Sequence, residues 1–238
     1  PRMMVLQARV SGDPMAEHER RCFVERSGLP DDHVVAHDLC VGPPSLPDLQ
    51  AFDALTVGGS GDFYVSRGDL PRFEETLEFL REVVERGFPT FASCFGFQCL
   101  VRALGGTLVH DPARAEVGTV EVTCTPAAAD DELFSRLPPS FQAQMGHNDR
   151  VETFPDGPVH LASSERCRYQ ALRIPGRPIW ATQFHPELDR ETNVDRFRRY
   201  LSAYGTHDRE SMEAAIAGFR DSPETSTLLR RFLDLVSG

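Results

Sequence analysis

The segment Pro89-Thr90-Phe91-Ala92-Ser93-Cys94-Phe95-Gly96-Phe97-Gln98 joins a predicted strand to a predicted helix. An apolar run leads up to Cys94, and apolar residues then recur with helical spacing. Enzymes that expose a nucleophile at such a sharp turn need small residues two positions before and after it. Ala92 and Gly96 meet this need around Cys94, whereas a turn centred on Ser93 would put phenylalanines in both small positions. The segment therefore predicts a nucleophile elbow with a cysteine at its corner.

The start of the predicted helix also provides chemistry for a thiol. A free cysteine has a pKa of about 8.5, and a helix N-terminus lowers such a pKa because it favours the thiolate. The first N–H groups of a helix have no partner within it, so the N–H of Phe95 could face an oxyanion. A buried structural cysteine is the alternative interpretation of Cys94, because free cysteines often behave as small core residues. The presence or absence of a suitable base elsewhere in the chain distinguishes the two interpretations.

The residues before the elbow predict a parallel β–α–β unit. A short strand at 55–57 runs into the glycine-rich turn Gly58-Gly59-Ser60-Gly61-Asp62, and a helix follows, with Asp69 as its cap and Gly87 at its end. That helix leads directly into the strand of Cys94, and the alternation implies a parallel-rich sheet covered by helices. The apolar face of the helix consists of Leu70, Phe73, Leu77, Leu80 and Val84.

The rest of the chain fits an α/β fold with a β-rich insertion and a helical end. Residues 144–151 are interpreted as a polar loop followed by a strand-like run. We expect one domain over 1–204 and a helical extension over 205–238 packed on the same domain. The other predicted elements are strands at 3–10, 33–39, 117–124, 159–162, 169–174 and 179–184, a helix at 14–26, and C-terminal helical faces at 194–204, 212–219 and 228–235.

Composition excludes several classes of protein. The chain has 238 residues and a net charge of −11, which argues against a surface that binds nucleic-acid phosphates. No apolar run approaches the ~20 residues of a membrane span, and no secretory signal is evident at the N-terminus. The six cysteines show no CxxC pair and no zinc-like spacing with histidine, so we expect reduced thiols, a cytoplasmic protein and no metal site. They are Cys22, Cys40, Cys94, Cys99, Cys124 and Cys167.

A candidate base follows the last predicted strand, in the motif Phe184-His185-Pro186-Glu187. In extended chain, residues i and i+2 point to the same side, so His185 and Glu187 can face one site. A thiol nucleophile needs a base to move its proton, and a carboxylate orients and polarises that base. The cleft at the carboxyl ends of parallel strands is where ligands bind in such sheets. Cys94, His185 and Glu187 are therefore the predicted catalytic residues.

These motifs together resemble the class I, or triad-type, glutamine amidotransferases, in particular free-standing proteins similar to the amidotransferase half of GMP synthase. The resemblance spans roughly residues 3 to 200 and departs from the family at two places. The elbow begins with Ala92 where the family usually has glycine, and Gly146-His147-Asn148 replaces a Ser-His-Gly type of loop. The motifs are Ala92-Ser93-Cys94-Phe95-Gly96-Phe97-Gln98, Phe184-His185-Pro186-Glu187, Gly58-Gly59-Ser60-Gly61-Asp62 and Met145-Gly146-His147-Asn148-Asp149.

The resemblance implies a flavodoxin-like, mostly parallel sheet flanked by helices, and a γ-glutamyl thioester on Cys94. It implies oxyanion N–H groups from Gly59 and Phe95, and no cofactor. The substrate pocket would be lined by Gly61, Gln98, Gly146 and His147.

Three functions remain open on the sequence alone. The first is hydrolysis of glutamine that supplies ammonia to a separate synthetase, since the chain has no ATP-binding P-loop motif of its own. The second is a γ-glutamyl peptidase or hydrolase that acts on larger γ-glutamyl amides. The third, a non-catalytic binding module, is disfavoured by the intact Cys94, His185 and Glu187. The expected ligand is a small molecule, glutamine or another γ-glutamyl compound.

Overall fold

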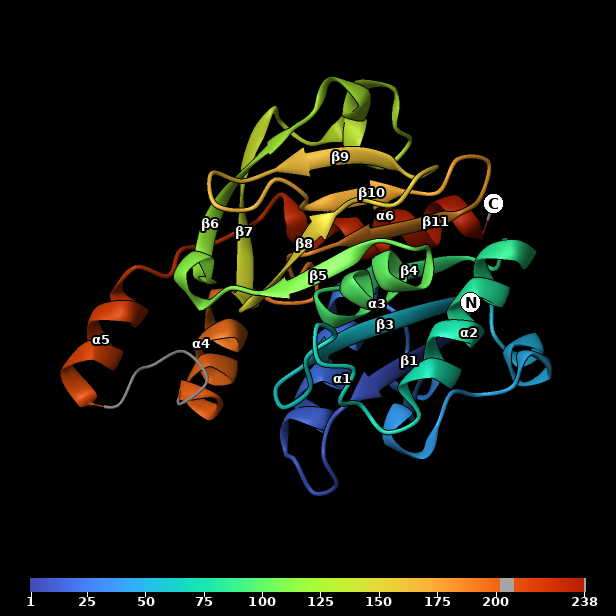
Figure 1. Cartoon of the computed structure of the whole chain (residues 1–238), viewed down its shortest axis with the longest axis horizontal. Helices are drawn as coiled ribbons and strands as arrows, with labels where there is room; N and C mark the ends of the chain where they lie inside the picture. Colours follow the sequence, from blue (N-terminus) through green and yellow to red (C-terminus); the bar gives the residue numbers. More distant parts are fainter. Residues whose placement is uncertain (202–207, 238) are drawn as a thin grey trace.

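A nine-stranded sheet forms the centre of the computed structural model, which describes residues 1–201 and 208–237. Its strand order is β2–β1–β3–β4–β11–β10–β9–β6–β7, and β5 pairs with β8 in a separate two-stranded sheet (Figure 1). The strands are β1 (Met3–Ala8), β2 (Val34–Asp38), β3 (Ala54–Ser60), β4 (Thr90–Ser93), β5 (Thr107–His110), β6 (Glu116–Cys124), β7 (Ser140–His147), β8 (Asp149–Thr153), β9 (Val159–Ser163), β10 (Ala171–Arg173) and β11 (Ile179–Thr182).

The parallel part of the sheet holds the elbow. β2, β1, β3, β4 and β11 pair in parallel, with β4 between β3 and β11. The remaining strands, β10, β9, β6 and β7, continue the sheet in antiparallel pairs. The predicted fold class, a mostly parallel sheet flanked by helices with helices at the C-terminus, is confirmed, and the β-rich part extends the same sheet.

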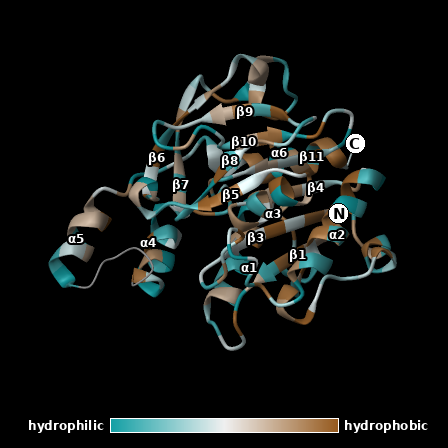
Figure 2. Cartoon of the chain, in the orientation of Figure 1, coloured by the Kyte–Doolittle hydropathy of each residue, from teal (hydrophilic) through white to brown (hydrophobic). Residues whose placement is uncertain are grey.

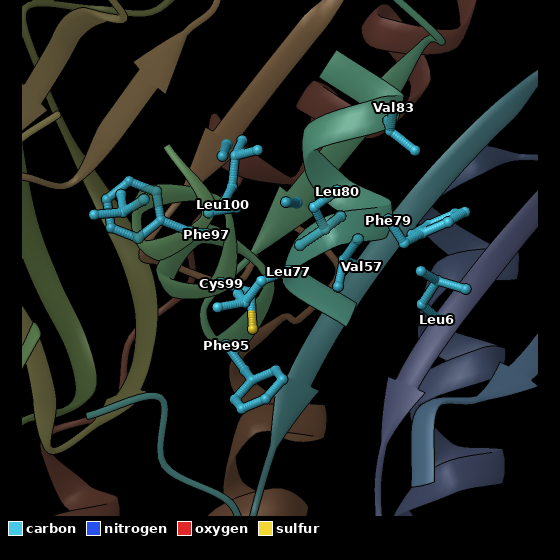
Figure 3. Packing of buried hydrophobic residues seen from close by; sticks show 14 of the residues in the cluster. Leu6, Val57, Leu77, Phe79, Leu80, Val83, Phe95, Phe97, Cys99 and Leu100 are labelled. Atoms are coloured by element: carbon cyan, nitrogen blue, oxygen red, sulfur yellow. The ribbon is translucent and has the colours of Figure 1, made fainter. Parts of the chain in front are cut away.

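Helices cover both faces of this sheet. Leu77 and Leu80 of α2 and Leu100 of α3 pack with Val57 on one face, as Figure 3 shows. On the other face, Phe23 of α1 and Phe232 of α6 pack in one cluster with the central strands. The helices are α1 (Met15–Ser27), α2 (Phe73–Arg86), α3 (Phe95–Ala103), α4 (Arg190–Arg199), α5 (Arg209–Ala217) and α6 (Leu228–Val236).

Strand β1 shows how the sequence fits two covered faces. Met4 and Leu6 belong to the core on the α2 side, whereas Met3 and Val5 belong to the core on the α1 side. Side chains alternate across a strand, so a strand buried on both faces reads as a continuous apolar run. Figure 2 shows the same pattern along β3, where hydrophobic colouring is concentrated.

Two predicted elements differ in the structure. Helix α2 begins at Phe73, not after Asp69, because Arg72 takes a left-handed conformation (φ 56°) and the Asp69 carboxylate accepts the N–H of Tyr64 instead. Residues predicted as a polar loop form the second half of β7 and the start of β8. Their polar side chains are compatible with a strand because partners within the protein satisfy them, as for Gln144, whose amide donates to the Arg220 carbonyl.

The C-terminal helices differ in how they pack. α6 is part of the core, since Leu228 and Phe232 are fully buried and Phe232 contacts Phe91 at a ring-centroid distance of 5.7 Å. α5 lies at the end of the molecule beside α4 (Figure 1), and its Met212 and Ile216 are only partly buried. The boundary proposed at 204/205, and Tyr204 itself, lie outside the described residues, so the division into a domain and an extension stays a prediction.

Within residues 1–201 and 208–237, no helix combines the length and apolar character needed to cross a bilayer.

Gly96 is expected to be required for stability. A Cβ built on it would lie 2.4 Å from the carbonyl oxygen of Val57, which is backbone and has little freedom to move. We expect Gly96→Ala to lower the free energy of unfolding by about 1–3 kcal/mol, the usual cost of overpacking a core. Chemical denaturation measures this, with Gly218→Ala as the control, because a Cβ there has only the Ala215 carbonyl oxygen at 3.3 Å. Equal stability of the two variants would contradict the expectation.

Candidate active site

Cys94 lies at the junction of β4 and α3 with strained backbone. Its φ of 51° and ψ of −104° place a non-glycine residue in a sparsely populated region. Such strain costs on the order of 1–3 kcal/mol and persists where the surroundings fix the backbone. Here the N–H of Cys94 donates to the carbonyl oxygen of Thr182 at 2.8 Å, which ties the corner to the end of β11. The side chain is therefore held at the carboxyl edge of the parallel strands.

His185 and Glu187 lie after β11, in a turn. The strand ends at Thr182, so the alternation of an extended chain, on which the prediction of their pairing rests, does not apply. They nevertheless face each other, with His185 Nδ1 2.7 Å from Glu187 Oε1. The N–H of His185 donates to the carbonyl oxygen of Gln144 at 2.9 Å, so β7 holds the backbone of this turn in place. Both side chains are buried.

The charges of this pair depend on each other. Burial alone would lower the pKa of His185, but the Glu187 carboxylate and the Cys94 sulfur, to which the imidazole also hydrogen-bonds, raise that pKa to about 9. Burial would likewise raise the pKa of Glu187, and the charges of His185 and Arg196 with their hydrogen bonds lower it to about 2. Since Nδ1 faces the carboxylate, Nε2 is the ring nitrogen left for the sulfur. At neutral pH the site therefore contains a charged imidazolium between the Glu187 carboxylate and the Cys94 sulfur.

The other five cysteines are poorer nucleophiles. Burial raises the pKa of Cys22 and Cys167 to about 12 and that of Cys40 to about 11, and it also raises the pKa of Cys99 and Cys124. We therefore expect limited iodoacetamide at neutral pH to alkylate Cys94 first, which peptide mass spectrometry measures. Faster labelling of Cys40 than of Cys94 would contradict this expectation.

A pocket opens beside Cys94, and all four predicted substrate-binding residues line it together with Phe95. Gln98 forms one wall, where its Nε2 donates to the Asp149 carbonyl oxygen at 3.1 Å and to Gln183 Oε1 at 3.0 Å. The Cys94 thiol is 3.8 Å from the Gly146 carbonyl oxygen, so β7 forms the opposite wall. The lining residues are Ser60, Gly61, Phe63, Tyr64, Cys94, Phe95, Gln98, Gly146, His147, Asn148 and Asp149.

The ring of His147 is engaged inside the protein. Its Nδ1 is 2.7 Å from the Asp149 carbonyl oxygen and its Nε2 is 2.9 Å from Glu116 Oε2. Because both ring nitrogens have protein partners, His147 contributes shape to the pocket wall in this structure. The resemblance implies that His147 contacts the substrate, whereas in this structure both ring nitrogens bind other parts of the protein.

Glu116, His147 and Cys167 form the group of described residues that most resembles a metal site. Their ligand atoms lie within 4.8 Å of one another, and the sequence did not predict this group. However, the Glu116 carboxylate already accepts hydrogen bonds from Gln170 Nε2 at 2.6 Å and Ser164 Oγ at 2.5 Å. Amide and hydroxyl donors aimed at both carboxylate oxygens are what a buried hydrogen-bond network contains, so this donor set does not fit a cation.

The predicted oxyanion donor Gly59 is next to the catalytic candidates, but its N–H is directed elsewhere. It donates to Glu19 Oε1 at 2.9 Å. A Cβ on Gly59 would lie 2.9 Å from His185 Cε1, so only glycine allows the imidazole its present position. Phe95, the other predicted donor, is the first residue of α3, where the N–H has no partner within the helix.

The sequence pattern does not predict the buried charges behind His185. Glu19 of α1 pairs with Arg9 at 2.9 Å, and Arg196 of α4 reaches Glu187 Oε1 at 3.2 Å. Arg9 also donates to Tyr200 Oη at 2.6 Å. In the sequence these charged residues stand in segments that also contain core residues. Any amphipathic helix has this pattern, so the pattern does not indicate that the charges are buried.

Comparison with proteins of known sequence supports the family. The glutamine-hydrolyzing GMP synthase of Thermosipho africanus is 34% identical over 133 residues, which cover 56% of this chain and 25% of that protein. That of Lactobacillus delbrueckii is 31% identical over 180 residues, covering 66% and 34%. The chain thus spans about a third or less of these two relatives. In Methanosarcina mazei, a protein named as one subunit of a glutamine-hydrolyzing GMP synthase is 27% identical over 157 residues, covering 66% and 79%.

Solved structures agree at the level of the fold. A glutamine amidotransferase from Thermotoga maritima superimposes with a TM-score of 0.73 at 18% identity, covering 99% of this chain and 97% of that one. A glutamine amidotransferase from Methylobacillus flagellatus gives a TM-score of 0.69 at 18% identity, covering 98% and 94%. The family model for class I glutamine amidotransferases matches residues 50–198, which include the elbow, the glycine-rich turn and the His185 motif. The chain belongs to the class I glutamine amidotransferase family.

Proposed function

We propose that this protein hydrolyses the side-chain amide of glutamine through a γ-glutamyl thioester on Cys94 and supplies the ammonia to a separate synthetase. The observation that carries the proposal is the arrangement of Cys94, His185 and Glu187, in which a strained elbow presents the thiol to an imidazole bonded at 2.7 Å to a buried carboxylate. This is the geometry by which a nucleophile, a base and an orienting acid act together.

In the first half of the reaction, Cys94 gives its thiol proton to His185 Nε2, and the resulting thiolate attacks the amide carbon of the substrate. The carbonyl oxygen becomes an oxyanion, which in this proposal is stabilised by the N–H of Phe95 at the start of α3. Such a donor contributes about 2.7–4 kcal/mol in related acyl transfers. His185 then gives its Nε2 proton to the leaving nitrogen, the C–N bond breaks, and ammonia leaves a thioester on Cys94.

In the second half, His185 accepts a proton from water, and the resulting hydroxide attacks the thioester carbon. The C–S bond breaks, the sulfur leaves as a thiolate, and glutamate is released. Glu187 stays ionised throughout, because the charges around it hold its pKa at about 2. Its role is to keep Nδ1 protonated and the ring oriented, so that Nε2 is the nitrogen that exchanges protons.

The proposed synthetase partner rests on the relatives. The Methanosarcina mazei relative is named as one subunit of a glutamine-hydrolyzing GMP synthase, and the match to this chain covers 79% of its length. The N–H of Gly59 donates to Glu19 in this structure, so in our proposal it has to turn toward the substrate before Gly59 and Phe95 can both act as oxyanion donors. All six cysteines are free thiols, which supports a reducing compartment such as the cytoplasm.

The test incubates the purified protein with glutamine and, separately, with γ-glutamyl dipeptides, and measures ammonia, free amine and glutamate. Equal release of ammonia and glutamate from glutamine, increased when the synthetase component of a GMP synthase is added, is the expected result. Amine release from dipeptides in preference to glutamine would replace the proposal with a γ-glutamyl hydrolase. Absence of turnover on both substrates, with and without the synthetase component, would contradict it.

A further inference from the structure

Arg196 differs from the other arginines of helix α4. It is 7% exposed, whereas Arg198, two residues further on, is at the surface and pairs with Asp195 there. The helix turns Arg196 toward the turn that holds His185 and Glu187, and it reaches this turn from a part of the chain that forms neither the elbow nor the base motif. Burying a guanidinium costs free energy unless anions offset its charge. The position of Arg196 next to the candidate catalytic groups therefore needs a physical explanation.

Arg196 contacts the hydrogen-bonded pair of His185 and Glu187. Its Nη1 lies 3.2 Å from Glu187 Oε1, the oxygen that also binds His185 Nδ1 at 2.7 Å, and it lies 3.2 Å from His185 Nδ1 as well. Glu187 Oε2, and Nε and Nη2 of Arg196, have no hydrogen-bond partner within residues 1–201 and 208–237. The Glu187 carboxylate is therefore held by the imidazole that it orients, by its own backbone N–H and by the guanidinium behind it.

Charges alternate along this part of the interior. Behind Arg196 lies Glu19, at 3.9 Å from Nη2, and behind Glu19 lies Arg9 at 2.9 Å. The series Cys94, His185, Glu187, Arg196, Glu19 and Arg9 thus runs from the elbow into the protein with alternating charge when the sulfur is a thiolate, although Arg196 Nη1 also lies 3.2 Å from His185 Nδ1. The other titratable groups facing this series are His18 and Cys22 of α1, Tyr200 after α4, and Asp13, which accepts the Tyr200 hydroxyl.

We propose that Arg196 is a positioning residue for this site: its guanidinium holds the Glu187 carboxylate against His185 and balances the charge that lets Cys94 and His185 rest as an ion pair. The inference rests on the proposed function in taking Cys94 as the nucleophile. It goes beyond the three catalytic candidates by assigning a fourth residue, from another helix, to the control of their charges.

The sign of its effect follows from electrostatics. Removing a buried cation makes the net charge of the series more negative by one, and this favours protonation of every nearby titratable group. The pH at which Cys94 becomes reactive and the pH at which His185 loses its proton should then both move upward. A residue with only a packing role would lower stability or rate without displacing these midpoints.

The experiment compares Arg196→Met with Arg198→Met, a matched control that makes the same substitution and the same charge change at the exposed surface of the same helix. The rate of iodoacetamide alkylation of Cys94 is measured against pH by mass spectrometry, alongside the pH profile of kcat/KM for glutamine. We expect Arg196→Met to shift the rise of the alkylation profile upward by about 1 pH unit, the lower end of the effect of a nearby opposite charge. Arg198→Met should leave it in place, and Arg196→Lys should restore most of the wild-type midpoint.

Unchanged midpoints in Arg196→Met, in a protein with wild-type circular dichroism, would overturn the proposal. A shift of the same size in Arg198→Met would also overturn it, since the effect would then belong to net charge. If Arg196→Met does not fold, Arg196→Gln and Arg196→Lys decide, with the upward shift expected only in the neutral variant. Alkylation needs no turnover, so it tests Arg196 even if glutamine is not the substrate, and the failure of the proposed function remains a separate outcome.

Discussion

Replacing Cys94 with alanine is expected to lower kcat for glutamine hydrolysis by a factor on the order of 10⁶, the loss seen when a hydrolase with a nucleophile, base and acid acting as one unit loses its nucleophile. The physical reason is that the thioester cannot form, and no other thiol described here faces the pocket that Phe95, Gln98 and Gly146 line. Glutamate and ammonia release by the purified variant measures the effect. We expect the Cys94→Ala variant to bind glutamine still, with an affinity that calorimetry can measure.

The matched control for this variant is Cys124→Ala. Cys124 is partly exposed on β6, where its thiol contacts the Pro138 carbonyl oxygen at 3.7 Å, away from the elbow. We expect that variant to keep the wild-type rate. Trapping of a γ-glutamyl adduct on Cys94 in the wild-type protein, seen as added mass on the peptide around the elbow, should disappear in Cys94→Ala. A Cys94→Ala protein that kept a tenth of the rate would show that the nucleophile is another group.

The elbow could be predicted from sequence because its requirements are local. A sharp strand-to-helix turn needs small residues at fixed offsets, and Ala92 and Gly96 occupy them around Cys94. The structure explains one of the two directly, since a side chain on Gly96 would meet the backbone of β3. The parallel unit on either side followed from the same kind of evidence, because the apolar spacing of α2 reflects the face that it buries.

Features set by distant contacts could not be predicted in this way. The sequence of β7 favours a polar loop because Gln144 and His147 are unusual in a buried strand, yet partners from remote segments satisfy both side chains. Likewise, the pattern of helix α2 allows a start at Asp69, but its carboxylate binds the N–H of Tyr64 in the preceding turn. Hydrogen bonding with residues outside the local pattern outweighed that pattern in each case.

The buried charges show the same limit at the candidate site. Glu19 lies in a helix whose composition is polar, and nothing in its spacing indicates that it would bind Arg9 and the N–H of Gly59 inside the protein. The base motif differs, because the strand that underlies the predicted pairing of His185 and Glu187 ends before them, and a turn brings their side chains together. Residue types identified the candidates, whereas tertiary structure determined how they are held.

Replacing His185 with alanine is expected to lower kcat by a factor also on the order of 10⁶, because nucleophile and base act as a unit, whereas Glu187→Ala should cost less, on the order of 10⁴. The imidazole moves the proton in both halves of the proposed reaction, while the carboxylate only orients and polarises it. His33→Ala is the control, since His33 lies just before β2 and its ring contacts the Pro1 carbonyl oxygen at 3.0 Å.

The wild-type pH profile gives an independent test of His185. Its neighbours raise its pKa from the ordinary 6.5 to about 9, so the imidazolium that protonates the leaving nitrogen is present at neutral pH and is lost as the pH rises through about 9. We therefore expect kcat/KM for glutamine to decline on the alkaline side with a midpoint near 9, as bell-shaped profiles report the acid and base of the free enzyme. In Glu187→Gln the midpoint should move to lower pH, because the anion that stabilises the imidazolium is gone. If the wild-type kcat/KM kept rising above a pH of about 9, another group would donate the proton to the leaving nitrogen.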